Sequence, residues 1–173
     1  MTRDQHPAWQ VYDKLRTARL NVNYYSMRLH ALERINFWLE LILAISAPTS
    51  AVAGLWFWQL PWGKLAWQCF GIIAAVAAVV KPLLNLTKRI KDFECHLSGY
   101  RALEYDLAEI KSLIEQKQKY DTVLQSEFRK TIQREKALVG KPPETRECSR
   151  VKKICEDQVL TQMPGKSFMI PEE

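Results

Sequence analysis

Glycine is scarce in this chain of 173 residues, which has six glycines and no glycine-rich loop of the kind that binds phosphate. The sequence also has no nucleophile elbow and no zinc-finger spacing of cysteine and histidine. Its three histidines, His6, His30 and His96, are not accompanied by a carboxylate and a nucleophile in a catalytic pattern. These absences argue against an enzyme, and we expect a protein that uses no cofactor and no metal.

The four cysteines do not change that expectation. Cys95 beside His96 looks like a metal-binding pair, but neighbouring residues on a helix point about 100° apart and chelate poorly. Cys69 falls within an apolar run, and the others are expected to face a reducing cytoplasm as free thiols. The alternative is a bridge between two chains through Cys148 and Cys155, which lie seven residues apart.

Two long apolar runs, residues 35–58 and 65–86, stand out against these absences. Each is about as long as the roughly 20 residues that a helix needs to cross the core of a bilayer. The mean hydropathy of the whole chain, -0.24, averages these runs with polar arms. We therefore predict an all-α membrane protein with a transmembrane hairpin over residues 35–86. The alternative is a buried hairpin in a soluble bundle, whose helices usually carry a polar stripe; residues 44–54 and 72–80 have none.

Basic residues lie mainly outside the hairpin. Lysine or arginine occurs repeatedly before residue 35 and just after residue 86, whereas the turn between the runs has only Lys64. The positive-inside rule then places both termini in the cytoplasm. Tryptophans gather around the turn, where their rings favour the headgroup layer: Trp56, Trp58, Trp62 and Trp67. The net charge of +6 suits anionic lipids, and no nucleic-acid-binding module is present to predict direct nucleic-acid binding.

Each apolar run contains one ionisable residue. Glu40 and Lys81 are each about five residues inside the cytoplasmic end of their run, roughly 7 to 8 Å deep at the helical rise. Equal depth allows an ion pair across the hairpin, in which each charge offsets the cost of burying the other. Two alternatives stay open: both side chains reach the interface separately, or both face the lumen of an oligomer.

Two prolines interrupt the apolar runs. Pro48 lies in the middle of the first run, and Pro82 directly follows Lys81 in the second. Each removes a backbone hydrogen bond and kinks its helix. The kinks are either static or hinges for gating, so both prolines join Glu40 and Lys81 as gating candidates. Residues 71–78 are rich in small side chains, which let helices approach closely.

Amphipathic patterns continue on both sides of the hairpin. Residues 1–34 predict a cytoplasmic helix that starts near Pro7, and residues 87–139 predict one long cytoplasmic helix because no proline interrupts them. Pairing Glu40 with Lys81 puts Val22 opposite Gly99 in an antiparallel stalk. The predicted stalk contacts are Leu29, Leu32, Ile90, Phe93, Leu97 and Tyr100.

The last part of the chain, residues 140–173, is predicted to be a linker, a short helix and a tail. Gly140 and two prolines after it end the long helix. A charged segment over 145–162 then places Cys148, Val151, Cys155 and Val159 on one helical face. This segment is either disordered alone or docked on the stalk or on a partner.

The arrangement of a cytoplasmic helix, two close membrane helices and a long following helix resembles the SLATT domain. The resemblance covers roughly residues 14–114, with the closest local match at Lys91, His96, Tyr100 and Leu103. SLATT proteins are two-transmembrane effectors of bacterial conflict systems that accompany nucleotide synthases or reverse transcriptases.

The resemblance implies an antiphage effector of the inner membrane that oligomerises and permeabilises the bilayer. Its trigger would be a nucleotide signal or a separately encoded partner protein, such as a synthase or reverse-transcriptase component. Two other functions stay open: a membrane anchor that recruits a cytosolic partner without forming a pore, and a subunit of a channel or transporter.

Overall fold

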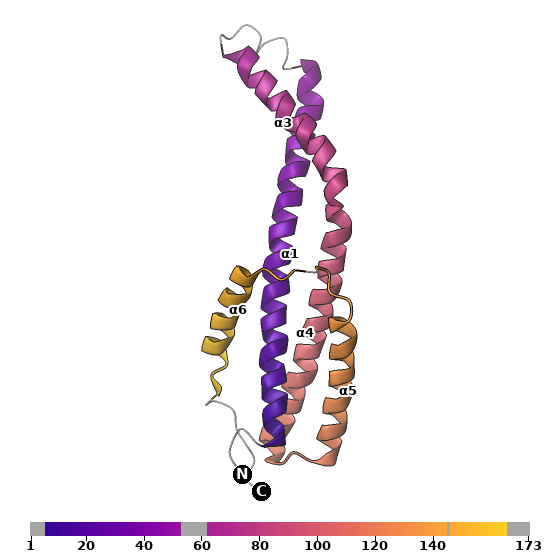
Figure 1. Cartoon of the computed structure of the whole chain (residues 1–173), viewed down its shortest axis with the longest axis vertical. Coiled ribbons are helices and arrows are strands. Elements are labelled where there is room, and N and C mark those ends of the chain that lie inside the picture. The colour runs from indigo at the N-terminus through magenta and orange to yellow at the C-terminus, as the bar shows by residue number, and fades with distance from the viewer. Residues whose placement is uncertain (1–5, 53–61, 145, 166–173) are drawn as a thin grey trace. The chain divides into compact units, whose positions relative to one another are not determined.

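The computed structural model describes residues 6–52, 62–144 and 146–165, without the side chains of residues 47–52, 64 and 67 (Figure 1). The described residues are helical or connect helices, and no strand occurs among them, so the predicted all-α class is confirmed. The helices are α1 (Pro7–Val52), α3 (Gly63–Leu84), α4 (Leu86–Lys117), α5 (Thr122–Val139) and α6 (Ser149–Gln162).

The chain divides into two compact units. Unit 1 contains Met1–Arg28 and Asp92–Glu173, and unit 2 contains Leu29–Lys91. Helices α1 and α4 therefore contribute residues to both units. The predicted start of the first helix at Pro7 is confirmed, as expected for a residue whose fixed φ suits the first helical turn.

Unit 1 is a helical bundle with a well-buried core. The ring of Tyr25 on α1 stacks on Tyr100 of α4 at 5.4 Å and meets Phe93 edge-on at 5.9 Å. Arg19 on α1 pairs with Glu104 on α4 at 2.7 Å. These contacts lie on either side of the level of Val22, so within unit 1 the predicted antiparallel register is correct. The buried core residues on α4 include Phe93, Leu97, Tyr100, Leu103, Leu107, Ile110 and Ile114.

The prediction of one helix over 87–139 is wrong at residues 118–121. There α4 ends and α5 turns back along it (Figure 1). Gln118 adopts a left-handed φ of 50°, and the Asp121 side chain accepts the backbone N–H of Leu124 at 2.9 Å to cap α5. The reversal lets α5 bury Leu124 and Phe128 in unit 1, and this burial favours the turn over a longer exposed helix.

A second break separates α3 from α4 at Asn85. This residue has φ 44° and ψ 41°, and its backbone N–H donates to the Pro82 carbonyl at 3.3 Å. Pro82 cannot donate a backbone hydrogen bond itself, so the last turn of α3 is already weakened. The predicted kink at Pro82 is thus realised as a helix end two residues later, at Leu84, and the second predicted span, residues 65–86, is not one continuous helix.

The short helix predicted within 145–162 is present as α6, which begins at Ser149. Cys155 and Val159 are buried, and the Cys155 Sγ lies 3.8 Å from the Met27 Sδ on α1. Of the alternatives left open by the sequence, the structure therefore has α6 docked on the stalk helix α1 within unit 1.

Among the described residues, no individual helix meets the requirement of length and hydropathy for a membrane span. One bent pair meets it on length and composition: Gln68–Leu84 together with Leu86–Lys117, at 46° to each other. Residues 53–58 of the first predicted span lie outside the described residues.

Candidate functional site

The Glu40 and Lys81 side chains meet between α1 and α3 within unit 2. The Lys81 Nζ lies 3.2 Å from the Glu40 Oε1, and the Asn36 Nδ2, one turn earlier on α1, donates to the same oxygen at 3.1 Å. The contact expected from equal depth is thus present. More than half of the Glu40 side chain, 53%, is exposed in the single chain, so the pair is accessible from outside the hairpin.

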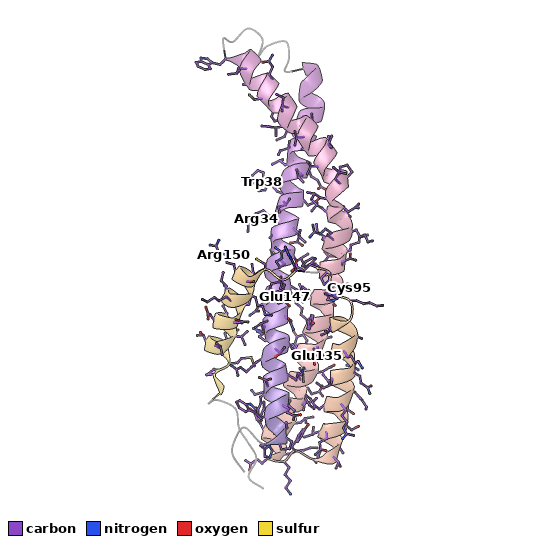
Figure 2. All side chains as sticks on the ribbon, viewed as in Figure 1. Arg34, Trp38, Cys95, Glu135, Glu147 and Arg150 are labelled. Atoms are coloured by element: carbon purple, nitrogen blue, oxygen red, sulfur yellow. The ribbon has the colours of Figure 1, made fainter. Side chains whose placement is uncertain are left out.

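The helices that carry this pair display apolar side chains on their outer surfaces. Those on α1 include Ile35, Phe37, Trp38 and Ile45, and those on α3 include Leu65, Ile72, Ile73, Val76, Val79 and Leu83. Figure 2 shows Arg34 and Trp38 on one side of α1, as a four-residue separation requires. Large exposed apolar patches of this kind are typical of surfaces that contact lipid or another protein.

Small residues of α3 are divided between the inside and the outside of the hairpin. Ala77 is buried within unit 2, whereas a Cβ built on Gly71 would meet no atom within 4 Å. The small-residue run therefore contributes to helix contact inside the hairpin at Ala77 and leaves Gly71 open to a neighbour. The gating candidate Pro48 belongs to α1, but its side chain lies outside the described residues.

A cavity of about 260 Å³ lies beside the ion pair, where α3 breaks into α4. Its described lining residues are Asn36, Lys81, Pro82, Asn85, Leu86, Thr87 and Lys88. Sequence reasoning named Lys81 and Pro82 as site residues and Lys88 only as a basic residue after the second span, and it missed Asn36, Asn85 and Thr87. The available signal was the asparagine three residues after a proline, because asparagine tolerates the left-handed conformation that ends a helix.

Of the four residues that match the SLATT pattern, three are buried in unit 1 and one, Lys91, is exposed. His96 is buried, and because a carbonyl can only accept, its Nε2 donates to the Leu138 carbonyl at the end of α5, at 3.1 Å. Tyr100 and Leu103 belong to the core of unit 1, and burial raises the pKa of Tyr100 to about 12. Lys91 and the neighbouring Cys95 are exposed. His96 thus connects α4 to α5, and none of the four positions lines a described cavity.

The remaining predicted stalk contacts are buried to different degrees. Leu29 and Leu32 are buried in unit 2, and Phe93 and Leu97 are buried in unit 1. Ile90 is only half-buried. Ile90 lies five residues after the break at Asn85. Because of this break, the apolar stripe of α4 does not continue in the direction that one uninterrupted helix would give it.

A polar cluster that the sequence did not reveal holds the segment after α5 against α1. The Arg28 Nη2 lies 2.7 Å from the Glu144 Oε2, and the Glu144 side chain is only 9% exposed. The Tyr24 hydroxyl donates to Glu144 and accepts the Cys148 backbone N–H at 2.9 Å. Burial, followed by the hydrogen bond to Glu144, raises the pKa of Tyr24 to about 12. We call these four residues the latch.

No group of three metal-binding side chains occurs within the described part of the chain. Comparison with known proteins found no match among protein-family models, curated proteins or solved structures. The described helices, with a buried core in unit 1 and exposed apolar side chains on α1 and α3 in unit 2, define the class: a helical protein with a packed bundle and an apolar hairpin.

Proposed function

We propose that the chain is a membrane effector without enzymatic activity. Residues 35–86 form a hairpin in the inner membrane, and both termini lie in the cytoplasm. Several copies associate and permeabilise the bilayer when a nucleotide signal or a partner protein reaches the cytoplasmic bundle. The observation that carries this proposal is the Glu40–Lys81 pair at 3.2 Å, which joins the otherwise apolar segments 35–52 of α1 and 65–84 of α3.

The pair explains how two charged residues are retained in such helices. A lone ion in a bilayer costs several kcal/mol, roughly +2.5–3.5 by insertion scales, and pairing offsets part of this cost. Helix α3 has 22 residues, which at the helical rise gives about 33 Å, close to the thickness of a hydrocarbon core. These properties support a membrane location for the hairpin.

The exposed half of Glu40 supports a role in an assembly. Two helices cannot enclose a channel, so a pore needs several hairpins. A carboxylate that remains accessible after pairing can reach a second hairpin or water in a pore. Gly71, which is open on the outside of α3, permits the close approach of another helix.

A different function is favoured by the cytoplasmic bundle. Unit 1 buries its own core and holds α6 through the latch, which is suited to a rigid platform on a membrane anchor. In that case the hairpin fixes the platform and no pore forms. A channel or transporter subunit is a third possibility, but it would be expected to have more polar residues in its spans than this hairpin has.

Leakage tests the effector against the anchor. The wild-type chain and Glu40→Ala, Lys81→Ala and Glu33→Ala are overproduced in bacteria to the same level, and entry of a membrane-impermeant dye is measured. We expect dye entry with wild type and with the control Glu33→Ala, which removes a carboxylate outside the apolar run, and altered entry with the other two. Equal entry for all four rules out the polar role, and no entry together with no conductance in vesicles favours the anchor.

A further inference from the structure

We propose that the cavity at the α3–α4 break binds a phosphate group, and that its source in the membrane is the phosphodiester of an anionic phospholipid. The choice of a lipid source rests on the proposed membrane location; the phosphate chemistry does not. The site is the cavity of about 260 Å³ at Asn85, which has room for a tetrahedral anion when one water takes roughly 30 Å³.

The side chains around this cavity favour an anion. Lys81 and Lys88 provide two ammonium groups, Thr87 provides a hydroxyl, and Asn36 and Asn85 provide amides. No carboxylate is among its described lining residues. The Lys81 Nζ and the Asn36 Nδ2 are both bonded to the Glu40 Oε1, so the net positive charge at the cavity comes from Lys88. Hydrogen bonds from ammonium groups to phosphate oxygens are charge-assisted and stronger than neutral ones.

The backbone at the break between α3 and α4 also favours an anion. Asn85 ends α3 in the left-handed conformation, and α4 starts at Leu86. The first N–H groups of a helix have no partner within it; the Arg89 N–H is bonded to the Asn85 carbonyl at 3.1 Å, one turn into α4. The first turn of α4 has no acidic residue, so the positive end of this helix dipole is not neutralised locally.

The place of the cavity in the sequence agrees with a lipid headgroup. Residues 81–88 are at the cytoplasmic end of the second predicted span, next to the basic residues that follow it. In the proposed topology this is the level of the inner-leaflet phosphates, which lie just outside the hydrocarbon core. A free phosphate would reach the same groups from the cytoplasm.

Native mass spectrometry of the full-length protein in a nonionic detergent tests this site. Phosphatidylglycerol and phosphatidylcholine are added separately, and the fraction of protein that retains a lipid is measured. We expect selective retention of phosphatidylglycerol, weakened roughly three- to tenfold by Lys88→Gln and also reduced by Thr87→Val. The matched control is Lys91→Gln, an exposed lysine on α4 that does not line the cavity, for which we expect a change below about twofold.

Inorganic phosphate distinguishes the two sources. Displacement of phosphatidylglycerol by millimolar phosphate supports one shared site, and Lys88-dependent phosphate binding without lipid selectivity assigns the site to free phosphate. Equal weakening by Lys88→Gln and Lys91→Gln, or binding of neither probe, overturns the proposal. Flotation of the same protein with phosphatidylcholine vesicles tests membrane association separately. A failure to float refutes the proposed membrane function. In that case, phosphate binding in detergent still decides whether the site exists.

Discussion

Units 1 and 2 are both helical, but they differ in the burial of their apolar residues. Unit 1 contains most of the buried hydrophobic residues described in the structure, whereas unit 2 contributes Leu29, Leu32, Ala77 and Leu86. Most of the large exposed hydrophobic residues are instead on α3 and the second half of α1. Unit 1 is therefore stabilised by its own core, whereas unit 2 leaves most of its large apolar side chains exposed in the single chain.

The largest expected difference in the free energy of unfolding is between two substitutions, one in each unit. Phe93 is fully buried in unit 1, and Phe93→Ala is expected to lower the free energy of unfolding by about 3–5 kcal/mol because it leaves a cavity. Val79 on α3 is 62% exposed, and Val79→Ala in detergent is expected to change it by about 0.5 kcal/mol or less. Denaturant unfolding followed by circular dichroism measures both. Similar losses would show that the two units do not differ as described.

The next effect concerns the latch in unit 1. Arg28→Ala leaves the Glu144 carboxylate buried without its ionic partner, and we expect a loss of about 1–3 kcal/mol with faster proteolysis between α5 and α6. Lys152→Ala is the control, because Lys152 and Glu147 form an exposed pair at 2.6 Å, which is worth at most about 1 kcal/mol. Proteolysis at the wild-type rate in Arg28→Ala would contradict the role of the latch.

Two glycines extend the comparison to backbone packing. A Cβ on Gly99 would lie 2.5 Å from the Leu138 Cδ2, whereas one on Gly71 would meet nothing within 4 Å. Gly99→Ala is expected to destabilise the chain by about 1 kcal/mol, and Gly71→Ala to stabilise it by about 0.5–1 kcal/mol through lower backbone entropy of the unfolded chain. Thermal unfolding of the detergent-solubilised variants checks the opposite signs; a gain for both would show that Leu138 moves aside at little cost.

The last effect appears only at alkaline pH. Burial raises the pKa of Tyr100 from 10.0 to about 12, so its contribution to stability is complete below pH 10 and is lost as the pH rises through about 12. Tyr100→Phe removes this titration and is expected to make stability fall less steeply between pH 10 and 12. The control Tyr105→Phe, at a tyrosine that is 76% exposed, should keep the wild-type slope. An unchanged slope in Tyr100→Phe would contradict the assignment.

Sequence patterns predicted the parts of this fold that depend on spacing. The helical class, the start at Pro7, the register around Val22 and the contact of Glu40 with Lys81 all follow from periodicity and depth. Each is a local or regular property, and a regular helix converts residue number directly into position.

The features that the sequence did not reveal depend on tertiary contacts. The turn at Gln118 was hidden because the apolar stripe of α5 looks the same whether α5 continues α4 or folds back on it. Asp121 was a visible capping residue, but a cap alone does not end a helix. Glu144 gave no signal in the sequence, because its burial depends on Tyr24 and Arg28, which are over a hundred residues away.

The central claim, that the hairpin lies in a bilayer, is tested most directly with two native cysteines. Cys69 on α3 and Cys95 on α4 are both exposed in the single chain, so they should react alike if both are in water. Single-cysteine variants that retain one of them are treated, in inner-membrane vesicles oriented with the cytoplasmic face outward, with a maleimide that cannot cross membranes. The account predicts rapid labelling of Cys95 and labelling of Cys69 only after detergent is added; equally rapid labelling of Cys69 in intact vesicles would contradict it.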